Sequence, residues 1–508
     1  MFVRKKRNSS GSVSIQIIDK ANGYKVAQTV GSAMNVEEVE RLWQKGLTIV
    51  HGARDGQQPL FPVQAETDTT VDNFVEELSN ASVRTIGPEL IFGTLFDRLG
   101  FNAVKEELFR HIVIARLAYP TSKLKTVDYL YRYKGVTVGL QTVYRFLDTL
   151  NDSYKEKVER IAYEHTKRTL GNISVVFYDM TTLYFEAEDE DDLRKIGFSK
   201  DGKFQKPQIM LGLLVGERGL PIGYDIFEGN TFEGHTLLPT LEKIQKKYEF
   251  GKPVVIADAG LLSTKNTQTL RDEGYRFIIG GRIKNESEEV QKEILERSEG
   301  MQDGDSCTIK KSDGTRLVVT YSDKRAKKDV YNREKGLRKL RKRVKTGRLT
   351  KESINNRGYN KFLSLEGETT VTIDEEKVKL EKQWDGLKGY VTNSRFSAGR
   401  ITENYTQLWQ IEKAFRISKT DLKVRPIHHY KRRRIEAHIC IAFVAYAIYK
   451  ELEIHLKKHK VEMSPRRAAE LTHNMYELEY TLPHSKEHKR RILRMDEEQD
   501  LLCHIIHR

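Results

Sequence analysis

Hydrophobic residues recur at helical spacing through the first part of the chain. Segments such as VKEELFRHIVIARLAY and LNDSYKEKVERIAYEHTKRTLG carry apolar side chains three or four positions apart, which predicts amphipathic helices. Residues 12–80 instead mix short alternating stretches, such as SVSIQII and YKVAQTV, with an acidic helix near residues 36–46. We therefore expect a mixed α/β region over residues 1–80 and a mostly helical region over residues 81–170.

The helical region contains a candidate DNA-binding element. The segment SKLKTVDYLYRYKGVTVGLQTVYRFLDTL suits two short helices broken at Gly135–Gly139, and it places Gln141, Thr142 and Arg145 on the outer face of the second helix. This arrangement is compatible with a helix-turn-helix, whose second helix reads the major groove of DNA. An ordinary helical hairpin explains the same pattern, so both interpretations stay open.

Strand patterns follow in residues 171–284. The run NISVVFYD is apolar and β-branched, and the alternating runs QIMLGLLV and LPIGYDIF are joined by GERG, a hairpin signal. Next come a helix (HTLLPTLEKIQKKY), a buried strand (KPVVIADAG), a helix over residues 263–273 and the strand YRFIIGG. Three antiparallel strands followed by alternating helix and strand is the order of an RNase H-like α/β core, although many α/β domains begin in the same way.

Residues 285–383 interrupt this order. They are polar, contain the basic segment REKGLRKLRKRVKTGR and end in the strand-like TTVTIDEEKVKLEKQW, which predicts an α+β insertion made of a charged helix and a small sheet. The strand LKGYVTN then resumes the core over residues 384–460, and a charged helical tail is expected over residues 461–508. The apolar run Ile439–Tyr449 is shorter than the roughly 20 residues that span a bilayer, so it predicts a buried helix.

Composition favours a polyanionic partner inside the cell. The 508 residues contain 87 Lys and Arg against 72 Asp and Glu, a net charge of +15, which is weak evidence for nucleic acid. Three cysteines without a CxxC pair fit a reducing compartment and exclude a cysteine-rich zinc module. The basic start MFVRKKRNSSGS has no apolar segment behind it and is not a secretory signal. We expect a cytoplasmic, nucleoid-associated protein without a membrane partner.

The segment YTQLWQIEKAFRISKTDLKVRP combines an apolar stripe with charged chemistry. At 3.6 residues per turn the stripe consists of Leu408, Ile411, Phe415 and Leu422. Glu412 is expected at the border of this stripe, half-buried, where an unpaired carboxylate costs several kcal/mol. Tyr405 and Lys419 lie seven residues to either side of Glu412. The predicted face could therefore hold a cation with its carboxylate and a phosphate backbone with its lysine.

Two aspartates are candidate partners for Glu412. Asp179 is expected to end the first core strand, and Asp258 to end a later buried strand. If these strands are neighbours, three carboxylates could hold two divalent cations about 3.5–4 Å apart, an arrangement that supports phosphodiester chemistry. Carboxylate oxygens favour magnesium or manganese over zinc. A strand-end aspartate is also often a turn or helix cap, so each aspartate alone leaves both roles open.

Two further charged motifs are weaker candidates. The acidic run Glu186–Asp192 is a competing source of metal ligands, but a run of like charges in a loop usually stays solvated. His428 and His429 lack a zinc-binding spacing and are better suited to contacts with backbone or phosphate. The basic run over residues 333–348 is either a solvated helix or a DNA contact.

Three motifs together resemble the DDE transposases of bacterial insertion sequences. These motifs are YDMTTLYFE, VVIADAGLLS and the spacing of Tyr405, Glu412 and Lys419, which is similar to the tyrosine, arginine, glutamate, lysine signature of one group. The resemblance runs from about residue 122 to residue 455 and includes GNTFEGHTLLP, KTDLKVRPIHHY and the insertion before the third acid. Leu408 occupies the position of the signature's arginine, and Arg416 is our candidate for supplying that charge.

The resemblance implies an RNase H-like fold and a catalytic triad of Asp179, Asp258 and Glu412 with two Mg²⁺ ions, for which Mn²⁺ can substitute. It also implies a homodimer or larger synapse on double-stranded DNA that cleaves at the element ends and joins the 3′ ends to target DNA. The candidate DNA-binding residues are Gln141, Arg145, Arg338, Lys342, Tyr405, Arg416, Lys419, Lys423 and Arg425. Alternatives are a nuclease of the same fold without strand transfer and a catalytically silent, transposase-derived DNA-binding protein.

Overall fold

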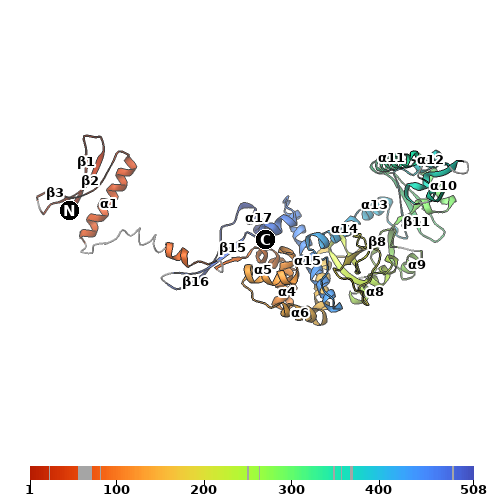
Figure 1. Ribbon diagram of the computed structural model, residues 1–508, viewed down its shortest axis with the longest axis horizontal. Coiled ribbons are helices and arrows are strands. Elements are labelled where there is room, and N and C mark those ends of the chain that lie inside the picture. Colours follow the sequence, from red (N-terminus) through yellow and green to blue (C-terminus); the bar gives the residue numbers. More distant parts are fainter. Residues whose placement is uncertain are drawn as a thin grey trace. The chain divides into compact units, whose positions relative to one another are not determined.

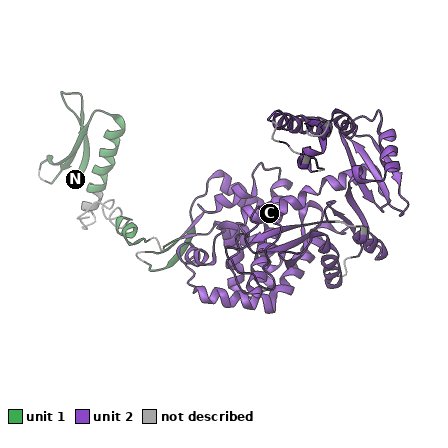
Figure 2. Cartoon of the chain, turned by 45° about the vertical axis from the view of Figure 1, so that its right-hand side comes forward, with its two compact units in different colours: residues 1–83, 478–491 green, residues 84–477, 492–508 purple. Residues whose placement is uncertain are grey.

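The chain divides into two compact units. The computed structural model describes residues 1–507 apart from 22, 55–70, 80–81, 249–250, 262–263, 347–348, 350, 356, 367–369 and 483–484. Unit 1 comprises Met1–Val83 and Leu478–Arg491, and unit 2 comprises Arg84–Glu477 and Ile492–Arg508 (Figure 2). The six-part division expected from the sequence stays a prediction. Parts of three predicted segments, at residues 55–70, at the start of the 263–273 helix and at the end of the 333–348 basic run, lie outside the described residues.

Unit 1 contains the predicted mixed α/β region. Strands β1 (Phe2–Arg7), β2 (Val13–Asp19) and β3 (Lys25–Ala33) form an antiparallel sheet in that order. Helix α1 (Val36–Arg54) packs on this sheet, and a Cβ added to Gly46 would lie 2.9 Å from a methyl carbon of Val3. The two alternating stretches and the acidic helix are thus confirmed, and the helix continues beyond its predicted end.

Unit 2 is organised around an eight-stranded sheet with the order β10-β11-β14-β9-β8-β5-β6-β7. Six of its strands are β5 (Val175–Tyr184), β6 (Gln208–Val215), β7 (Pro221–Glu228), β8 (Val254–Ala257), β9 (Arg276–Gly281) and β14 (Leu387–Thr392). Strands β5, β6 and β7 run antiparallel, whereas β8 is parallel to β5 and β9 is parallel to β8. Along the chain, the three antiparallel strands come first, and α8 (Leu237–Tyr248) and α9 (Thr264–Asp272) then alternate with β8 and β9, as expected from the sequence.

The insertion differs from its prediction in two respects. Strands β10 (Ser306–Lys310) and β11 (Arg316–Tyr321) do not form a separate sheet, because β11 pairs with β14 and extends the core sheet. A small sheet does form from β12 (Leu363–Glu366) and β13 (Thr370–Ile373). The following EEKVKLEK was expected as strand but forms α12 (Glu375–Lys382), because Asp374 caps the backbone N–H of Lys377 at 3.0 Å. The insertion also contains α10 (Glu288–Ser298) and the basic helix α11 (Asp323–Lys345).

Helices cover the sheet and surround a long apolar helix. Beyond β4 (Val83–Thr85), they are α3 (Thr94–Leu99), α4 (Glu107–Ala118), α5 (Lys123–Lys134), α6 (Leu140–Thr149) and α7 (Lys155–Leu170), as the periodicity predicted. Helix α15 (Arg432–Lys458) contains the run Ile439–Tyr449 and packs against α4, α6, α7 and β7 (Figure 1). None of the described helices is long and apolar enough to cross a lipid bilayer.

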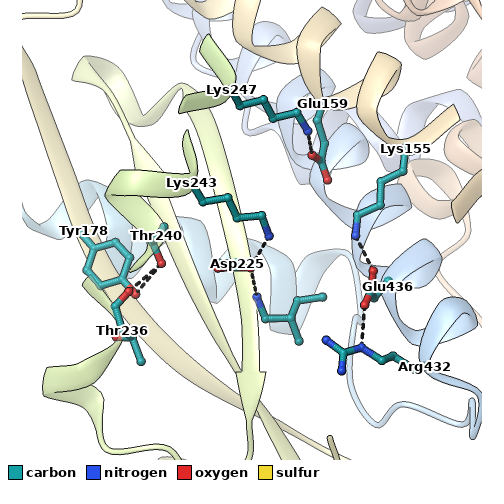
Figure 3. Close-up of polar contacts among 11 residues, drawn as sticks. Lys155, Glu159, Tyr178, Asp225, Thr236, Thr240, Lys243, Lys247, Arg432 and Glu436 are labelled. Carbon is teal, nitrogen blue, oxygen red and sulfur yellow. Dashed lines mark hydrogen bonds and ion pairs between the residues drawn. The ribbon is translucent and has the colours of Figure 1, made fainter. Parts of the chain in front are cut away.

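Ion pairs join these helices to each other and to the sheet (Figure 3). Glu436 of α15 accepts hydrogen bonds from Lys155 of α7 at 2.6 Å and from Arg432 at 3.0 Å. Glu159 of α7 pairs with Lys247 of α8 at 2.5 Å. The Lys155–Glu436 pair therefore joins α7 to α15, and the Lys247–Glu159 pair joins α7 to α8.

The tail is not entirely helical. Helices α16 (Pro465–Thr472) and α17 (Glu497–His507) are separated by β15 (Tyr476–Thr481) and β16 (His488–Ile492). The helical prediction was wrong for these two strands. In β15 the sequence YELEYT alternates large apolar or aromatic residues with acids, which is the two-residue period of a strand.

Candidate active site

Asp179 and Asp258 lie on neighbouring parallel strands. Tyr178 of β5 is opposite Ala257 of β8, so the two aspartates that follow them stand at the same level of the sheet. Asp258 directly follows β8, as predicted. Asp179 does not end its strand, because β5 continues to Tyr184 by pairing with β6. The sheet therefore brings together the two acids that the sequence singled out.

Lys200 and Glu233 complete the surroundings of Asp179. The Nζ atom of Lys200 lies 3.8 Å from Oδ1 of Asp179 and 2.9 Å from Oε1 of Glu233, and it donates to the carbonyl oxygen of Met180 at 2.7 Å. Burial raises the pKa of Asp179 to about 6, Lys200 opposes this rise, and the carboxylates of Glu233 and Asp258 add to it. The site thus concentrates negative charge around one ammonium group.

Sequence reasoning did not single out Lys200 or Glu233. Glu233 lies within the GNTFEGHTLLP segment, where an acid shortly before a helix is most simply interpreted as part of the helix start. In the structure a Cβ added to Gly260 would lie 3.9 Å from Oε2 of Glu233, so this carboxylate faces the loop that follows Asp258. Only the fold reveals this proximity.

Tyr405 contacts Asp258. Helix α13 (Ala398–Thr406) carries Tyr405, whose hydroxyl donates to Oδ1 of Asp258 at 3.1 Å. The approach requires Gly280 on β9, because a Cβ there would lie 2.6 Å from the phenol oxygen. The ammonium of Lys388 lies 4.4 Å from the centroid of the Tyr405 ring. Tyr405 was expected to bind DNA phosphate, but its side chain is buried and bonded to an acid.

The helix that carries Glu412 is interrupted. Instead of one helix, the segment forms α13, then α14 (Trp409–Arg416), then a π-helical turn over Ile417–Asp421. Tyr405, Glu412 and Lys419 therefore belong to three successive pieces. The apolar stripe is buried as predicted, but Glu412 is exposed rather than half-buried, so that expectation was wrong.

Glu412 is not assembled with the two aspartates into a ready-made metal site. Burial raises the pKa of the Tyr405 phenol, the neighbouring Asp258 carboxylate raises it further, and the charge of Glu412 adds a smaller effect. Within the described part of the chain, no three His, Cys, Asp or Glu side chains lie close enough together to hold an ion.

Lys419 and Arg425 converge on Asp201. Nζ of Lys419 lies 3.1 Å from Oδ1 of Asp201, and Nη1 of Arg425 lies 2.6 Å from Oδ2. The Lys419 side chain is only 10% exposed. Sequence reasoning missed Asp201, which lies in the connection between β5 and β6 and carries no motif. Arg416 and Lys423 are exposed.

The candidate DNA-binding residues of α6 and α11 are exposed. Gln141 and Arg145 lie on the outer surface of α6, as predicted. Arg338 and Lys342 are exposed on α11, and neither forms an ion pair with any residue that the structure describes. The beginning of the basic run is different, since Arg333 is buried and pairs with Asp385.

The weaker candidate motifs are held by local contacts. Asp191 of the acidic run accepts hydrogen bonds from the backbone N–H groups of Leu193 and Arg194 at 2.9 and 2.6 Å and pairs with the Arg194 guanidinium at 2.7 Å. Its role is therefore that of a local cap. His428 is exposed, whereas His429 is buried.

A cavity of about 570 Å³ adjoins Asp258. It extends from the ends of the core strands to the insertion, and its lining includes Tyr405, Lys388, Arg325 and Lys361. The lining also includes Asp329, Glu381 and Asp385, which pair with Arg325, Lys361 and Arg333. The cavity thus has side chains of both charges in its lining and opens beside the exposed carboxylate of Asp258.

Two solved transposase structures match this chain with low TM-scores. A piggyBac transposase synaptic complex with hairpin DNA matches with a TM-score of 0.39 and 10% identity over 72% of this chain and 69% of that chain. A Mos1 transposase paired-end complex with the left transposon end matches with a TM-score of 0.16 and 12% identity over 31% of this chain and 53% of that chain.

Two curated relatives are similar in sequence. The transposase of insertion sequence element IS1151 from Clostridium perfringens is 22% identical over 52% of this chain and 54% of its own length. The transposase of IS231C from Bacillus thuringiensis subsp. berliner is 27% identical over 41% of this chain and 40% of its own length. The match thus spans about half the length of these relatives or less.

A family model covers both aspartates and the broken helix. The model of the transposase DDE domain matches residues 170–448, which is more than half of the chain. This range includes Asp179, Asp258, Glu412 and the insertion between β9 and β14. By this match the chain belongs to the family of transposase DDE domains.

Proposed function

We propose that this protein is a transposase that binds the ends of an insertion sequence, cleaves DNA beside them and joins the freed 3′ ends to target DNA. The observation that carries the proposal is the common level of Asp179 and Asp258 on adjacent parallel strands within the matched domain. An RNase H-like core is part of the proposal, supported by the antiparallel strands β5–β7 followed by β8 and β9 parallel to β5.

The acids suit divalent cations. Asp179, Asp258 and the neighbouring Glu233 present hard carboxylate oxygens, and the Lys200 ammonium already balances charge between Asp179 and Glu233. We assign Asp179, Asp258 and Glu412 as the catalytic residues that hold two Mg²⁺ ions, which Mn²⁺ can replace. When bound, such ions would supply charge stabilisation to the attacked phosphate and a lower pKa to a coordinated water.

The residues around the acids have positioning roles in this proposal. Tyr405 fixes the orientation of the Asp258 carboxylate through its hydrogen bond. Lys200 offsets the burial of Asp179 and so favours its ionised form. Lys388 and Arg325 line the adjoining cavity, where their positive charge favours the approach of a DNA phosphate. No covalent protein intermediate is needed, because water and then the freed 3′ hydroxyl act as nucleophiles.

DNA recognition is assigned to surfaces outside the acids. Gln141 and Arg145 on α6 are proposed to read the element end as part of a helix-turn-helix. Exposed cations on α11, at the end of α14 and just after the π-helical turn are proposed to contact phosphates without regard to sequence: Arg338, Lys342, Arg416 and Lys423. Lys419 and Arg425, which pair with Asp201, are proposed to contribute to the binding of DNA phosphates. Two copies are proposed to act together, since both ends of an element must be processed.

The test uses DNA that carries the inverted repeats flanking the coding region. The purified protein is incubated with labelled repeat ends and a target plasmid in Mg²⁺, and both cut ends and joined products are measured. We expect both, with no product in chelator. Cut ends without joined products would show that the protein is a nuclease without strand transfer. Binding to the repeats without either product would show that it is a catalytically silent, transposase-derived DNA-binding protein.

A further inference from the structure

A second basic cavity lies away from Asp258. Its volume is about 250 Å³, and its walls come from the end of α4, the start of α5, the segment 423–429 and α15. The basic side chains that line it are Arg116, Lys123, Lys423, Arg425, His428, His429 and His438. No carboxylate is among the described lining residues, and none of them lines the cavity beside Asp258.

Lys123 is buried in this wall without a partner. The residue is 6% exposed, and its Nζ atom makes no hydrogen bond within the described structure. Burial lowers the pKa of Lys123 well below its ordinary value, and the charge of Arg116 lowers it further. A buried ammonium without a counter-charge or acceptor is costly. The Lys123 side chain is therefore placed to bind an acceptor group that the described part of the chain does not supply.

The neighbouring basic groups are also unneutralised. Arg116 is 5% exposed, and its Nη1 donates to the carbonyl oxygens of Leu422 and Lys423 at 3.3 and 3.5 Å, with no acidic partner among the described residues. These contacts fix the guanidinium against the segment that forms the opposite wall. Arg425 differs, since it pairs with Asp201.

Two of the three histidines that line the cavity, His429 and His438, are buried, and burial lowers their pKa values so that they are neutral. Nε2 of His438 donates to the carbonyl oxygen of Val424 at 2.9 Å, which leaves its buried Nδ1 without a partner. Burial lowers the pKa of His429 to about 3, and the charges of Lys123, Arg434 and Arg116 lower it further. The inner wall thus presents the guanidinium of Arg116 and the amino group of Lys123, from two different helices, and a bound anion would favour the charged form of Lys123.

We propose that this cavity binds a phosphate group. A phosphate supplies the negative charge and the acceptor oxygens that Lys123 and Arg116 lack, and arginine and lysine are the side chains that bind phosphate best. Both cations are more than nine-tenths buried, so the group must project into the cavity. A terminal phosphate of a DNA strand and inorganic phosphate both have this shape. The cavity is separate from the catalytic acids, so the phosphate site does not depend on the proposed cleavage reaction.

The first experiment is a calorimetric titration of the full-length protein with inorganic phosphate, without Mg²⁺ or DNA. We expect saturable binding accompanied by proton uptake, because the bound anion restores the charge of Lys123; the heat will then depend on the ionisation enthalpy of the buffer. Lys123→Met is expected to weaken binding about tenfold or more and to abolish the proton uptake. The matched control Lys125→Met changes an exposed lysine on the same helix and is expected to bind like the wild type.

A second experiment identifies the source of the phosphate. Single-stranded oligonucleotides with a 5′ phosphate or a 5′ hydroxyl are compared as competitors of inorganic phosphate. If the wild type binds the 5′-phosphorylated strand more tightly and Lys123→Met does not, the site binds a DNA end. If the wild type binds both strands equally, the site binds the free anion. Thermal unfolding in phosphate-free buffer is expected to show Lys123→Met at least as stable as the wild type. Absence of saturable phosphate binding and of proton uptake in the wild type would overturn the proposal, whatever the DNA-cleavage assay shows.

Discussion

The hydroxyl of Tyr405 donates a hydrogen bond to the carboxylate of Asp258, with 3.1 Å between Oη and Oδ1. The two residues come from α13 and from the end of β8, and Gly280 on β9 provides the room for their contact. Asp258 itself is exposed at the end of its strand, and its Oδ1 also accepts a hydrogen bond from the backbone N–H of Ala259 at 2.8 Å. The phenol and this amide together set the direction of the carboxylate, and the phenol is the side chain among them.

Replacing Tyr405 by Phe is expected to slow DNA cleavage about tenfold or more, because a hydrogen bond to a charged group is lost at a residue that acts in catalysis. DNA affinity is expected to stay unchanged, since the buried ring cannot reach the duplex. Single-turnover cleavage and equilibrium binding measure the two effects separately. Tyr449→Phe is the matched control, as it removes an equivalent bond to Asp421 at 3.0 Å. Weaker DNA binding with an unchanged rate would restore the phosphate-contact role predicted from the sequence.

The central sheet could be predicted because its strands are short, apolar and bounded by turn signals. The strands β5 to β9 and β14 follow patterns that depend on local sequence alone. The pairing of β11 with β14 could not be predicted, because it joins segments of the insertion and the core that are distant in sequence. Likewise, the break between α13 and α14 lies in a sequence with helical periodicity throughout, where tertiary packing overrides local preference.

The sequence predicted a site residue where an acid follows an apolar strand. It did not predict residues that reach the site only because distant segments of the chain pack together. Asp258 stands out in VVIADAGLL. Lys200, Asp201 and Glu233 lie in polar connections whose sequence resembles ordinary loops, and only the sheet brings them to Asp179 or Lys419. Glu412 was expected to be half-buried, and the break at residues 407–408 changes its orientation.

Alanine at Asp179, Asp258 or Glu412 is expected to reduce cleavage in Mg²⁺ to background in each case, because the three acids act as a unit. Each variant is expected to remain folded and to bind DNA, since the loss of one acid relieves repulsion when no cation is present. Gel-based cleavage, DNA binding and circular dichroism check these outcomes. Asp189→Ala, in the exposed acidic run, is the control and is expected to retain wild-type activity. Wild-type cutting by Glu412→Ala would remove this residue from the assignment.

Reversing the charge of Arg338 and Lys342 is expected to weaken DNA binding and to reduce its salt dependence. The plot of log K against log salt has a negative slope, which becomes less steep by about 0.9 for each phosphate contact that is lost. The slope of the double variant should therefore be less steep than that of the wild type by roughly 2. The control reverses Lys292 and Arg297 on α10, which gives the same change in net charge at exposed positions. Equal slopes for both double variants would place the DNA surface outside α11.

Alanine at Gln141 and Arg145 is expected to reduce the preference for the element end over random DNA. A side chain that reads a base edge contributes about 1–3 kcal/mol of discrimination, whereas non-specific binding by the α11 cations is expected to persist. The ratio of the two dissociation constants, measured at one salt concentration, is the decisive quantity. An unchanged ratio would favour an ordinary helical hairpin at α5 and α6.

Glu453 makes the stability of unit 2 depend on pH. Its side chain is 7% exposed, and it pairs with Lys450 at 2.6 Å, with Lys457 at 3.0 Å and with Lys413. Burial alone would raise the pKa of Glu453, but its hydrogen bonds with Lys413 and Lys450 and the nearby Lys457 lower it from 4.5 to about 2. A carboxyl whose pKa is lower in the folded state stabilises the fold above its unfolded pKa, and this contribution is lost as the pH falls from 4.5 toward 2.

Glu453→Gln is accordingly expected to lower the free energy of unfolding by about 3–5 kcal/mol at neutral pH, because Lys450, which is 3% exposed, and Lys413 keep their charges without the acid. The difference from the wild type should shrink as the pH approaches 2, where the native carboxyl is itself protonated. Urea unfolding at several pH values measures it. Glu470→Gln is the control, since its pair with Arg466 is exposed and is expected to contribute less than about 1 kcal/mol. A constant difference across this pH range would mean that Glu453 stabilises the helix by packing rather than by its charge.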